Sequence, residues 1–399
     1  MQSIKELFKI GNGPSSSHTM GPKNATLIFN ERYKQADYVK VILYGSFALT
    51  GKGHLTDQII DKTLIAKHDI EFDYLDVPPH PNTVDYIAYK ENKEIGKLRV
   101  FSIGGGCIRI DGEEVDSKKD IYPLNTLFDI KEYCVKNRIS LSDYVYSIED
   151  DNFRDYLEHI LDVMLSGIER GLNVEGTLPG LLKINRKAKM LYDKHVDETN
   201  DERDIRHLYA YAYATSEENA SGGEIVTAPT CGSCGVMPAV IRYSMEHDNI
   251  SRKTVIDGLA VAGLIGNLVK KNASISGAEA GCQAEVGTAC AMASAYYAYV
   301  KGANIDHIDQ SAEIALEHHL GLTCDPIMGY VQIPCVERNA VAAIRAINAY
   351  NLASLLNSSD SKISFDLVVK TMLETGHDLT SNYRETSLGG LAKNYKGEF

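Results

Sequence analysis

The sequence has no excess of positive charge and no apolar run long enough to cross a membrane. Its 54 acidic and 41 basic residues give a formal net charge of −13, whereas proteins that bind nucleic acid need clustered Lys and Arg for the phosphates. The longest apolar run, around residues 258–266, is far shorter than the roughly 20 residues of a membrane-spanning helix. These absences argue against nucleic acid and membranes as partners.

A secretory signal is also missing, because residues 1–10 mix charged with apolar side chains and contain no long apolar core. We therefore expect a cytoplasmic protein. In that compartment the eight cysteines are expected to be reduced, as free thiols, metal ligands or redox groups.

Internal repeats and low-complexity tracts are absent, but the pattern changes along the chain. β-branched and aromatic runs bounded by Gly predict strands within residues 36–45 and 96–112, and apolar residues at helical spacing predict a helix over 21–34. Further along, helical periodicity dominates, with Ala-rich and Gly-rich segments. The sequence predicts an α+β N-terminal domain, residues 1–146, followed by a larger, mostly α-helical catalytic domain, residues 147–399.

Several cofactor signatures are incomplete. The glycines before Cys107 lack both a G-x-G-x-x-G pattern and the Gly-Lys-Ser/Thr ending of a phosphate loop. A convincing lysine and phosphate loop for pyridoxal phosphate are not found either. Cys231 and Cys234 form a C-x-x-C pair, but no second pair or histidine partner follows at zinc-finger spacing. A zinc or thiol redox sensor built on this pair is the alternative that lies outside enzymes.

Three polar, glycine-bounded segments could contribute to a site. GNGPSSSHTMGP, residues 11–22, places hydroxyls before a helix, where they could bind a carboxylate or only cap the helix. GSFALTGKGHLTD, residues 45–57, presents His54, which could be a general base or a surface histidine bonded to Asp57. The third, ENASGGEIVTAPTCGSCGVMP, residues 218–238, suits a substrate loop.

Three other cysteines have neighbours that favour metal binding. Cys282 lies in a Gly/Ala loop before a helix, Cys324 precedes Asp-Pro, and Cys335 follows Pro334 at the start of another helix. All three cysteines are expected at helix starts, which lower thiol pKa values, and three thiolates at one point suit an iron–sulfur cubane with one open iron. Zinc, or three buried core cysteines, would fit the same spacing.

Taken together, the motifs SSSHTMGP, GSFALTGKGH, EGTLPGLL, SGAEAGCQAEVG and CDPIMGYVQIPCVERN resemble the bacterial iron–sulfur L-serine dehydratases over nearly the whole chain. In that resemblance the chain is a fusion of a beta-like and an alpha-like region. It implies a lyase that converts L-serine to pyruvate and ammonia, an L-serine ammonia-lyase, and a homodimer. A related lyase acting on threonine, cysteine or another small substrate with a β-leaving group is the alternative.

The resemblance also implies roles for individual residues. It implies a [4Fe–4S] cluster bound by Cys282, Cys324 and Cys335, whose fourth iron is open to substrate, and His54 as the base that removes the α-proton. The implied substrate contacts are Ser15, Ser16, Ser17, His18 and Thr19, together with Asn219, Ser221 and Thr230. The N-terminal region looks shorter than in the family, and no cysteine follows Cys335, so capping of the open iron by a terminal cysteine is not expected.

Overall fold

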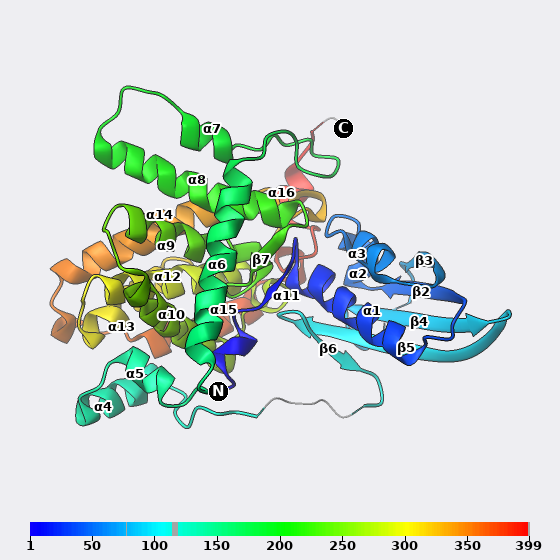
Figure 1. Cartoon of the computed structure of the whole chain (residues 1–399), viewed down its shortest axis with the longest axis horizontal. Helices are drawn as coiled ribbons and strands as arrows, with labels where there is room; N and C mark the ends of the chain where they lie inside the picture. Colours follow the sequence, from blue (N-terminus) through cyan, green and yellow to red (C-terminus); the bar gives the residue numbers. More distant parts are fainter. Residues whose placement is uncertain (77, 114–118, 398–399) are drawn as a thin grey trace.

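A computed structural model describes residues 1–76, 78–113 and 119–397. Figure 1 shows a small α/β part beside a larger part made mostly of helices. The predicted fold class is therefore confirmed. None of the described helices is long and apolar enough to span a membrane.

The small part is built on a five-stranded mixed sheet with strand order β3-β2-β4-β5-β6. Its strands are β2 (Tyr38–Tyr44), β3 (Lys67–Asp73), β4 (Thr83–Lys90), β5 (Lys93–Gly104) and β6 (Cys107–Ile110). β2 pairs in parallel with β3, and the other neighbours pair antiparallel.

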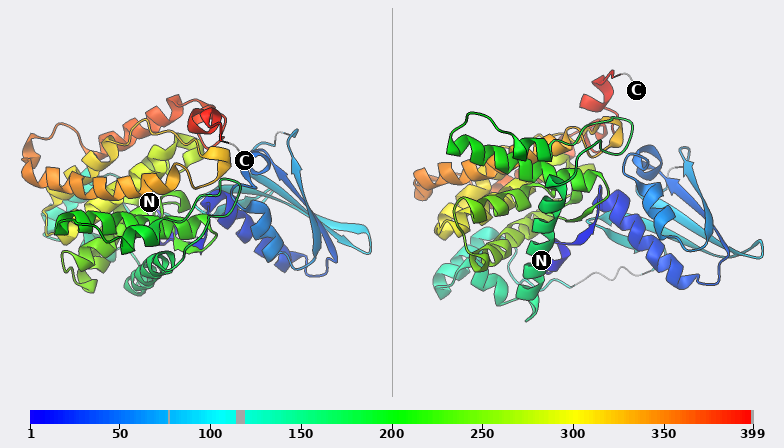
Figure 2. Two further views of the ribbon diagram at one scale, coloured as in Figure 1. Left: turned by 90° about the horizontal axis from the view of Figure 1, so that it is seen from above. Right: turned by 45° about the horizontal axis from the view of Figure 1, so that its top comes forward.

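One face of this sheet is covered by helices α1 (Gly21–Arg32), α2 (Ser46–Thr50) and α3 (Thr56–Thr63). Alternate residues of β2, namely Val39, Val41 and Leu43, are buried and pack with Phe29 of α1 and Phe47 of α2. This period of two is what the strand pattern of the sequence predicts for a half-buried sheet. Both views in Figure 2 place the sheet at one end of the molecule and the helices of the larger part at the other.

The larger part has one continuous hydrophobic core. Its helices are α4 (Leu127–Asn137), α5 (Leu141–Tyr146), α6 (Phe153–Leu172), α7 (Ala188–Asp193), α8 (Asn200–Ala220), α9 (Val236–Glu246), α10 (Arg252–Asn272), α11 (Gly277–Ala280), α12 (Thr288–Val300), α13 (Ile305–Glu317), α14 (Cys335–Leu355), α15 (Phe365–Asp378) and α16 (Gly390–Asn394). Alanine and glycine dominate the contacting faces of α10 and α12, which allows these helices to pack closely.

The described residues also form seven short helical turns: η1 (Ile4–Glu6), η2 (Ser16–Met20), η3 (Cys231–Ser233), η4 (Gln283–Gly287), η5 (Ile327–Gly329), η6 (Ser358–Asp360) and η7 (Ser381–Tyr383). Of these, η2 and η4 have π-helical hydrogen bonding and directly precede α1 and α12. Single π-helical turns of this kind are frequent at functional sites.

The first residues of the chain belong to the larger core, because Met1, Ile4, Leu7 and Phe8 are buried in it. The same core takes in α4 and α5, although the sequence places them before the division at residues 146 and 147. The domain division at that point stays a prediction.

A short antiparallel pair of strands leads from the larger part into the smaller one. β1 (Ile10–Asn12) pairs with β7 (Glu224–Val226), with Ile10 opposite Val226. The segment that follows β1 therefore starts beside the segment that surrounds β7. This pairing brings the serine-rich stretch of residues 15–17 next to the loop around Thr230, although more than 200 residues separate them along the chain.

Candidate active site

A cavity of about 330 Å³ receives residues from both parts of the molecule. The segments around η2 and α2 contribute three serines and a histidine, and the helical part contributes a threonine, two further serines, thiols and carboxylates. Its polar lining includes Ser15, Ser16, Ser17, His54, Thr230, Cys282, Glu285, Cys324, Cys335 and Glu385, and also Gln2, Glu6, Cys107, Lys270, Ser274, Ser276 and Glu279.

His54 lies between α2 and α3 and is completely buried. Its Nδ1 donates to the carbonyl of Thr50 at 3.0 Å, so its Nε2 carries the lone pair. No hydrogen-bond partner for this Nε2 is found among the described residues. Burial lowers the pKa of His54 from 6.5 to about 4, so the imidazole is neutral near pH 7 and can accept a proton.

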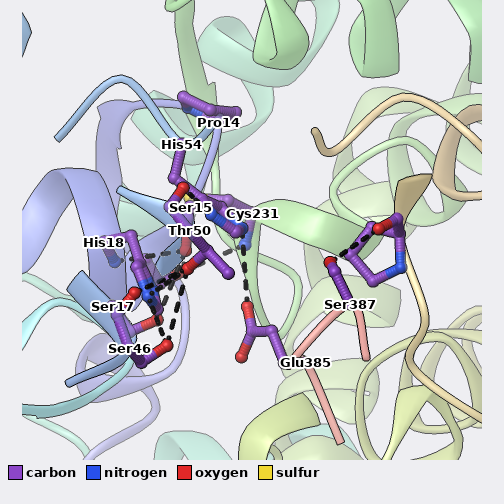
Figure 3. A network of polar contacts seen from close by, with 12 residues as sticks. Pro14, Ser15, Ser17, His18, Ser46, Thr50, His54, Cys231, Glu385 and Ser387 are labelled. Carbon is purple, nitrogen blue, oxygen red and sulfur yellow. Dashed lines mark hydrogen bonds and ion pairs between the residues drawn. The ribbon is translucent and has the colours of Figure 1, made fainter. Parts of the chain in front are cut away.

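His18 packs against the ring of His54. The two rings stack with centroids 4.4 Å apart, and each loop bonds the other: Thr19 Oγ1 donates to the His54 carbonyl at 2.8 Å, and Thr56 Oγ1 donates to the His18 carbonyl at 2.6 Å. Burial, and then the neighbouring His54, keep the pKa of His18 well below its usual value. Ser17, Ser46 and Thr50 occupy both ring nitrogens of His18, as Figure 3 shows.

The three predicted serines reach the cavity in different ways. The hydroxyls of Ser15 and Ser17 lie 3.3 Å apart, and Ser15 also caps η2 by accepting from the His18 N–H. Ser16 accepts from the Cys231 N–H at 3.0 Å and donates to its sulfur. The segment therefore both caps a helical turn and lines the cavity, so the two interpretations of its sequence do not exclude each other.

The three predicted cysteine ligands also line this cavity. Cys282 directly precedes η4, and Cys335 is the first residue of α14, as the sequence suggested. The expectation of a helix start is wrong for Cys324. That residue is held in an extended segment, where its N–H donates to the Tyr383 carbonyl and its carbonyl accepts from the Glu385 N–H, both at 2.8 Å.

Two of the cysteines lie closest together. The ligand atoms of Cys282, Cys324 and Glu285 are within 4.8 Å of one another, whereas Cys335 lines the same cavity without joining this group. A hydrogen bond from Cys324, followed by the charge of Arg338, lowers the pKa of Cys282 to about 6. The pKa of Cys335 is raised by burial, so its position at a helix start does not lower it here.

Glu285 is an acidic residue of this site that the sequence reasoning missed. Its Oε1 accepts from Thr230 at 2.7 Å, and a Cβ on Gly277 would lie 2.6 Å from its Oε2. Burial, and then the nearby Cys282, hold the pKa of Glu285 well above its usual value. The motif GCQAEVG contains this residue, but only the fold shows that it faces the cavity.

Glu385 was also missed, because it lies in a C-terminal segment without a recognisable chemical pattern. Its Oε1 is 3.7 Å from His54 Nε2, as drawn in Figure 3. Burial, and then the proximity of Cys282, raise the pKa of Glu385 to about 7. His54 and Glu385 thus face each other from the two parts of the molecule.

Four predicted substrate contacts do not line the cavity. His18 and Thr19 bond within the histidine pair described above, Asn219 donates to the Pro14 carbonyl at 3.0 Å, and Ser221 accepts from Arg186 at 2.8 Å. They surround the site without facing it. Their predicted contacts with substrate stay predictions.

The C-x-x-C pair is buried. Cys231 and Cys234 are 0% and 1% exposed, and burial raises the pKa of Cys231 to about 12. Thiols that are inaccessible and protonated react slowly. This environment disfavours a thiol sensor.

Comparison with known families agrees with this arrangement. Residues 58–392 match the family described as Serine dehydratase alpha chain, and residues 3–67 match Serine dehydratase beta chain. The chain belongs to the serine dehydratase family. It is therefore a lyase-family member in which sequences typical of the alpha and beta chains are joined in one polypeptide.

Curated relatives of this serine dehydratase family member are similar over almost their full length. L-serine dehydratase 2 of Escherichia coli (strain K12) is 39% identical over 455 aligned residues, which cover 98% of both chains. L-serine dehydratase of Helicobacter pylori (strain ATCC 700392 / 26695) is 41% identical over 451 residues, covering 99% of both chains. These alignments are longer than the 399 residues of this chain, so they contain gaps in it.

Proposed function

We propose that this protein is a [4Fe–4S]-dependent L-serine dehydratase that forms pyruvate and ammonia. The observation that carries the proposal is that three cysteines and a buried neutral histidine line one cavity. The relatives named L-serine dehydratase support L-serine as the substrate. The cytoplasmic location and the homodimer stay predictions.

The cysteine arrangement fits a cluster better than a single zinc ion. Two thiolates on one zinc lie at most about 4.6 Å apart, because each Zn–S bond is roughly 2.3 Å. The ligand atoms of Cys282, Cys324 and Glu285 lie within 4.8 Å of one another, close to that limit, but Cys335 does not belong to the same group. Three thiolates spread over one cavity wall suit a cubane in which each cysteine binds a different iron.

A bound cluster with an open iron supplies Lewis-acid chemistry, which would make the substrate hydroxyl a better leaving group. Arg338 lies beside the thiols, and its N–H groups donate to the Thr323 carbonyl at 2.6 Å and to Asp325 at 3.4 Å. Its positive charge offsets the negative charge of the cysteines. The chain thus provides both the ligands and a buried counter-charge.

His54 removes the α-proton in the proposed reaction. Its Nε2 faces the cavity while the Thr50 carbonyl fixes the tautomer through Nδ1. Once Nε2 takes the proton, the imidazolium lies beside the Glu385 carboxyl group, which stabilises the positive charge. Loss of water then yields an enamine, which tautomerises and hydrolyses to pyruvate and ammonia.

The substrate carboxylate is proposed to bind the hydroxyls of Ser15, Ser16, Ser17 and Thr230, which line the cavity. His18 and Thr19 would position His54, and Asn219 and Ser221 would position the surrounding loops. Hydroxyl donors can bind a carboxylate without placing a positive charge next to the base.

Pyruvate formation from L-serine tests the proposal. Protein purified and reconstituted without oxygen is assayed before and after exposure to air, and again after treatment with iron and reductant. We expect activity that air abolishes and iron restores. Activity that is indifferent to air would contradict the cluster, and activity with threonine or cysteine in place of serine would identify the related lyase.

A further inference from the structure

The proposed reaction leaves one group on the substrate α-carbon without a partner. In that proposal His54 takes the hydrogen, the serine-rich segment binds the carboxylate, and the hydroxymethyl group would lie toward the cysteines. We propose that Glu385 binds the α-ammonium group and thereby selects α-amino acids over acids that lack this group. This inference rests on the proposed function and adds a specificity-determining residue to it.

The position of Glu385 relative to the base carries the inference. Its Oε1 lies 3.7 Å from His54 Nε2, and both residues line the same cavity. The base and the ammonium partner must approach the same carbon, because the amino nitrogen is about 1.5 Å from Cα and a carboxylate binds an ammonium group at roughly 2.8 Å. A residue beside Nε2 meets this requirement.

The backbone holds Glu385 in place before substrate arrives. Its N–H donates to the carbonyl of Cys324 at 2.8 Å, and the Cys324 N–H donates to the carbonyl of Tyr383, also at 2.8 Å. Glu385 has φ of 58°, a left-handed conformation that is uncommon for a residue with a side chain. Such backbone strain occurs most often at ligand-binding and catalytic positions.

The charges around Glu385 leave room for a cationic ligand. Among the described residues its only ion-pair partner is His54, which is neutral when it acts as a base. The Glu385 side chain is only 13% exposed, and a largely buried carboxylate without a cationic partner is energetically unfavourable. Glu285, which is also partly buried, already accepts from Thr230 and lies against the cysteines. The substrate ammonium would therefore pair with Glu385.

Binding of L-alanine and propionate to the reconstituted protein tests this inference without turnover. These two compounds share the carboxylate and the methyl group and differ in the ammonium, and neither has a leaving group. Isothermal titration calorimetry without oxygen compares the wild type with E385Q, E385D and, as a control, E279Q. Glu279 also lines the cavity, but it is exposed and accepts from Ser274 at 2.7 Å.

We expect wild type and E279Q to prefer L-alanine. E385Q should lose about 30-fold or more in affinity for L-alanine, as when one partner of a buried ion pair is removed, while its affinity for propionate stays unchanged. E385D keeps the charge and should recover part of the preference. Equal losses for both ligands in E385Q would overturn the inference, because Glu385 would then only shape the cavity; unchanged L-alanine binding would overturn it as well.

Pyruvate formation by the wild type is measured in parallel and separates the two proposals. If the wild type forms pyruvate from L-serine but E385Q keeps the full preference for L-alanine, only the role of Glu385 is wrong. If the wild type neither forms pyruvate nor distinguishes L-alanine from propionate, both proposals are wrong.

Discussion

The two walls of the cavity differ in chemistry and in the way they are built. The wall formed by the segments around η2 and α2, here called the histidine wall, presents hydroxyls and a neutral histidine. Its two segments are joined by hydrogen bonds such as those from Thr19 to His54 and from Thr56 to His18. The wall from the helical part, here called the thiol wall, presents thiols and carboxylates, which reach the cavity from loops distant in the sequence. Proton acceptance and metal binding therefore belong to separate walls.

This separation lets a neutral base and a group of anionic metal ligands share one cavity. Negative charge from the thiolates and carboxylates would raise the pKa of a base placed among them. Burial between α2 and α3 instead lowers the pKa of His54 to about 4. Of the carboxylates that line the cavity, Glu385 lies beside the base, with its Oε1 3.7 Å from His54 Nε2.

The largest expected effect comes from the thiol wall. Cys282→Ser removes the thiol whose pKa is lowered to about 6 and should abolish both iron loading and pyruvate formation. Iron and acid-labile sulfide per chain are measured after reconstitution. Cys134→Ser is the matched control, since Cys134 is buried in α4 and does not line the cavity. A Cys282→Ser protein with a full complement of iron would contradict the assignment of this ligand.

The next largest effect is expected from a substitution in the histidine wall, which should leave the metal ligands of the thiol wall intact. His54→Asn removes the base and should lower kcat by roughly 10²–10⁴-fold, with iron content unchanged. Steady-state kinetics and iron analysis check both parts. His68→Asn serves as the control, because His68 lies on β3 and bonds Asp61. Loss of iron in His54→Asn would show that the two walls are not independent.

The sequence predicted the thiol wall better than the arrangement around it. Cys282 and Cys335 lie next to Gly or Pro at the start of helical segments, and those neighbours are visible in the sequence. Cys324 was misplaced because its position depends on bonds to Tyr383 and Glu385, which are 59 and 61 residues away. Glu285 and Glu385 were missed for the same physical reason: a lone acidic residue has no local pattern, and only tertiary packing turns it toward a cavity.

The helix over residues 21–34 and the strands within residues 36–45 and 96–112 were predictable because their hydrophobic period is local. Residues 21–34 and 36–45 became α1 and β2 with small changes at their ends. By contrast, no local pattern indicated that Met1 to Phe8 would be buried in the core of the helical part. Burial of that segment depends on contacts with helices more than 100 residues later.

The buried His18 should make the stability of the protein sensitive to acid. The folded protein holds His18 neutral with a pKa well below 6.5, so below pH 6.5 the unfolded chain binds a proton that the folded chain does not. Stability then falls as the pH falls, by up to about 1.4 kcal/mol per pH unit for this group. His18→Asn should reduce that slope. The midpoint of thermal unfolding is measured for the variant and the wild type at each pH. The difference between the two midpoints cancels the contribution of groups that both proteins share, including Glu385. Equal slopes would contradict the prediction.

The last prediction tests how tightly the thiol wall is packed. A methyl group on Gly277 would lie 2.6 Å from Glu285 Oε2 and 3.2 Å from Cys324 Sγ, so Gly277→Ala should destabilise the protein by about 1–3 kcal/mol through overpacking. Gly167→Ala is the control, because the nearest atom to its methyl group would be 3.9 Å away within α6. There the better helix propensity of alanine should stabilise the protein by up to about 1 kcal/mol. Thermal unfolding of both variants gives the sign of each change. If Gly277→Ala unfolds at the same temperature as the wild type, the carboxylate of Glu285 must be able to move away from the added methyl group. The thiol wall would then be less rigid than its contacts indicate.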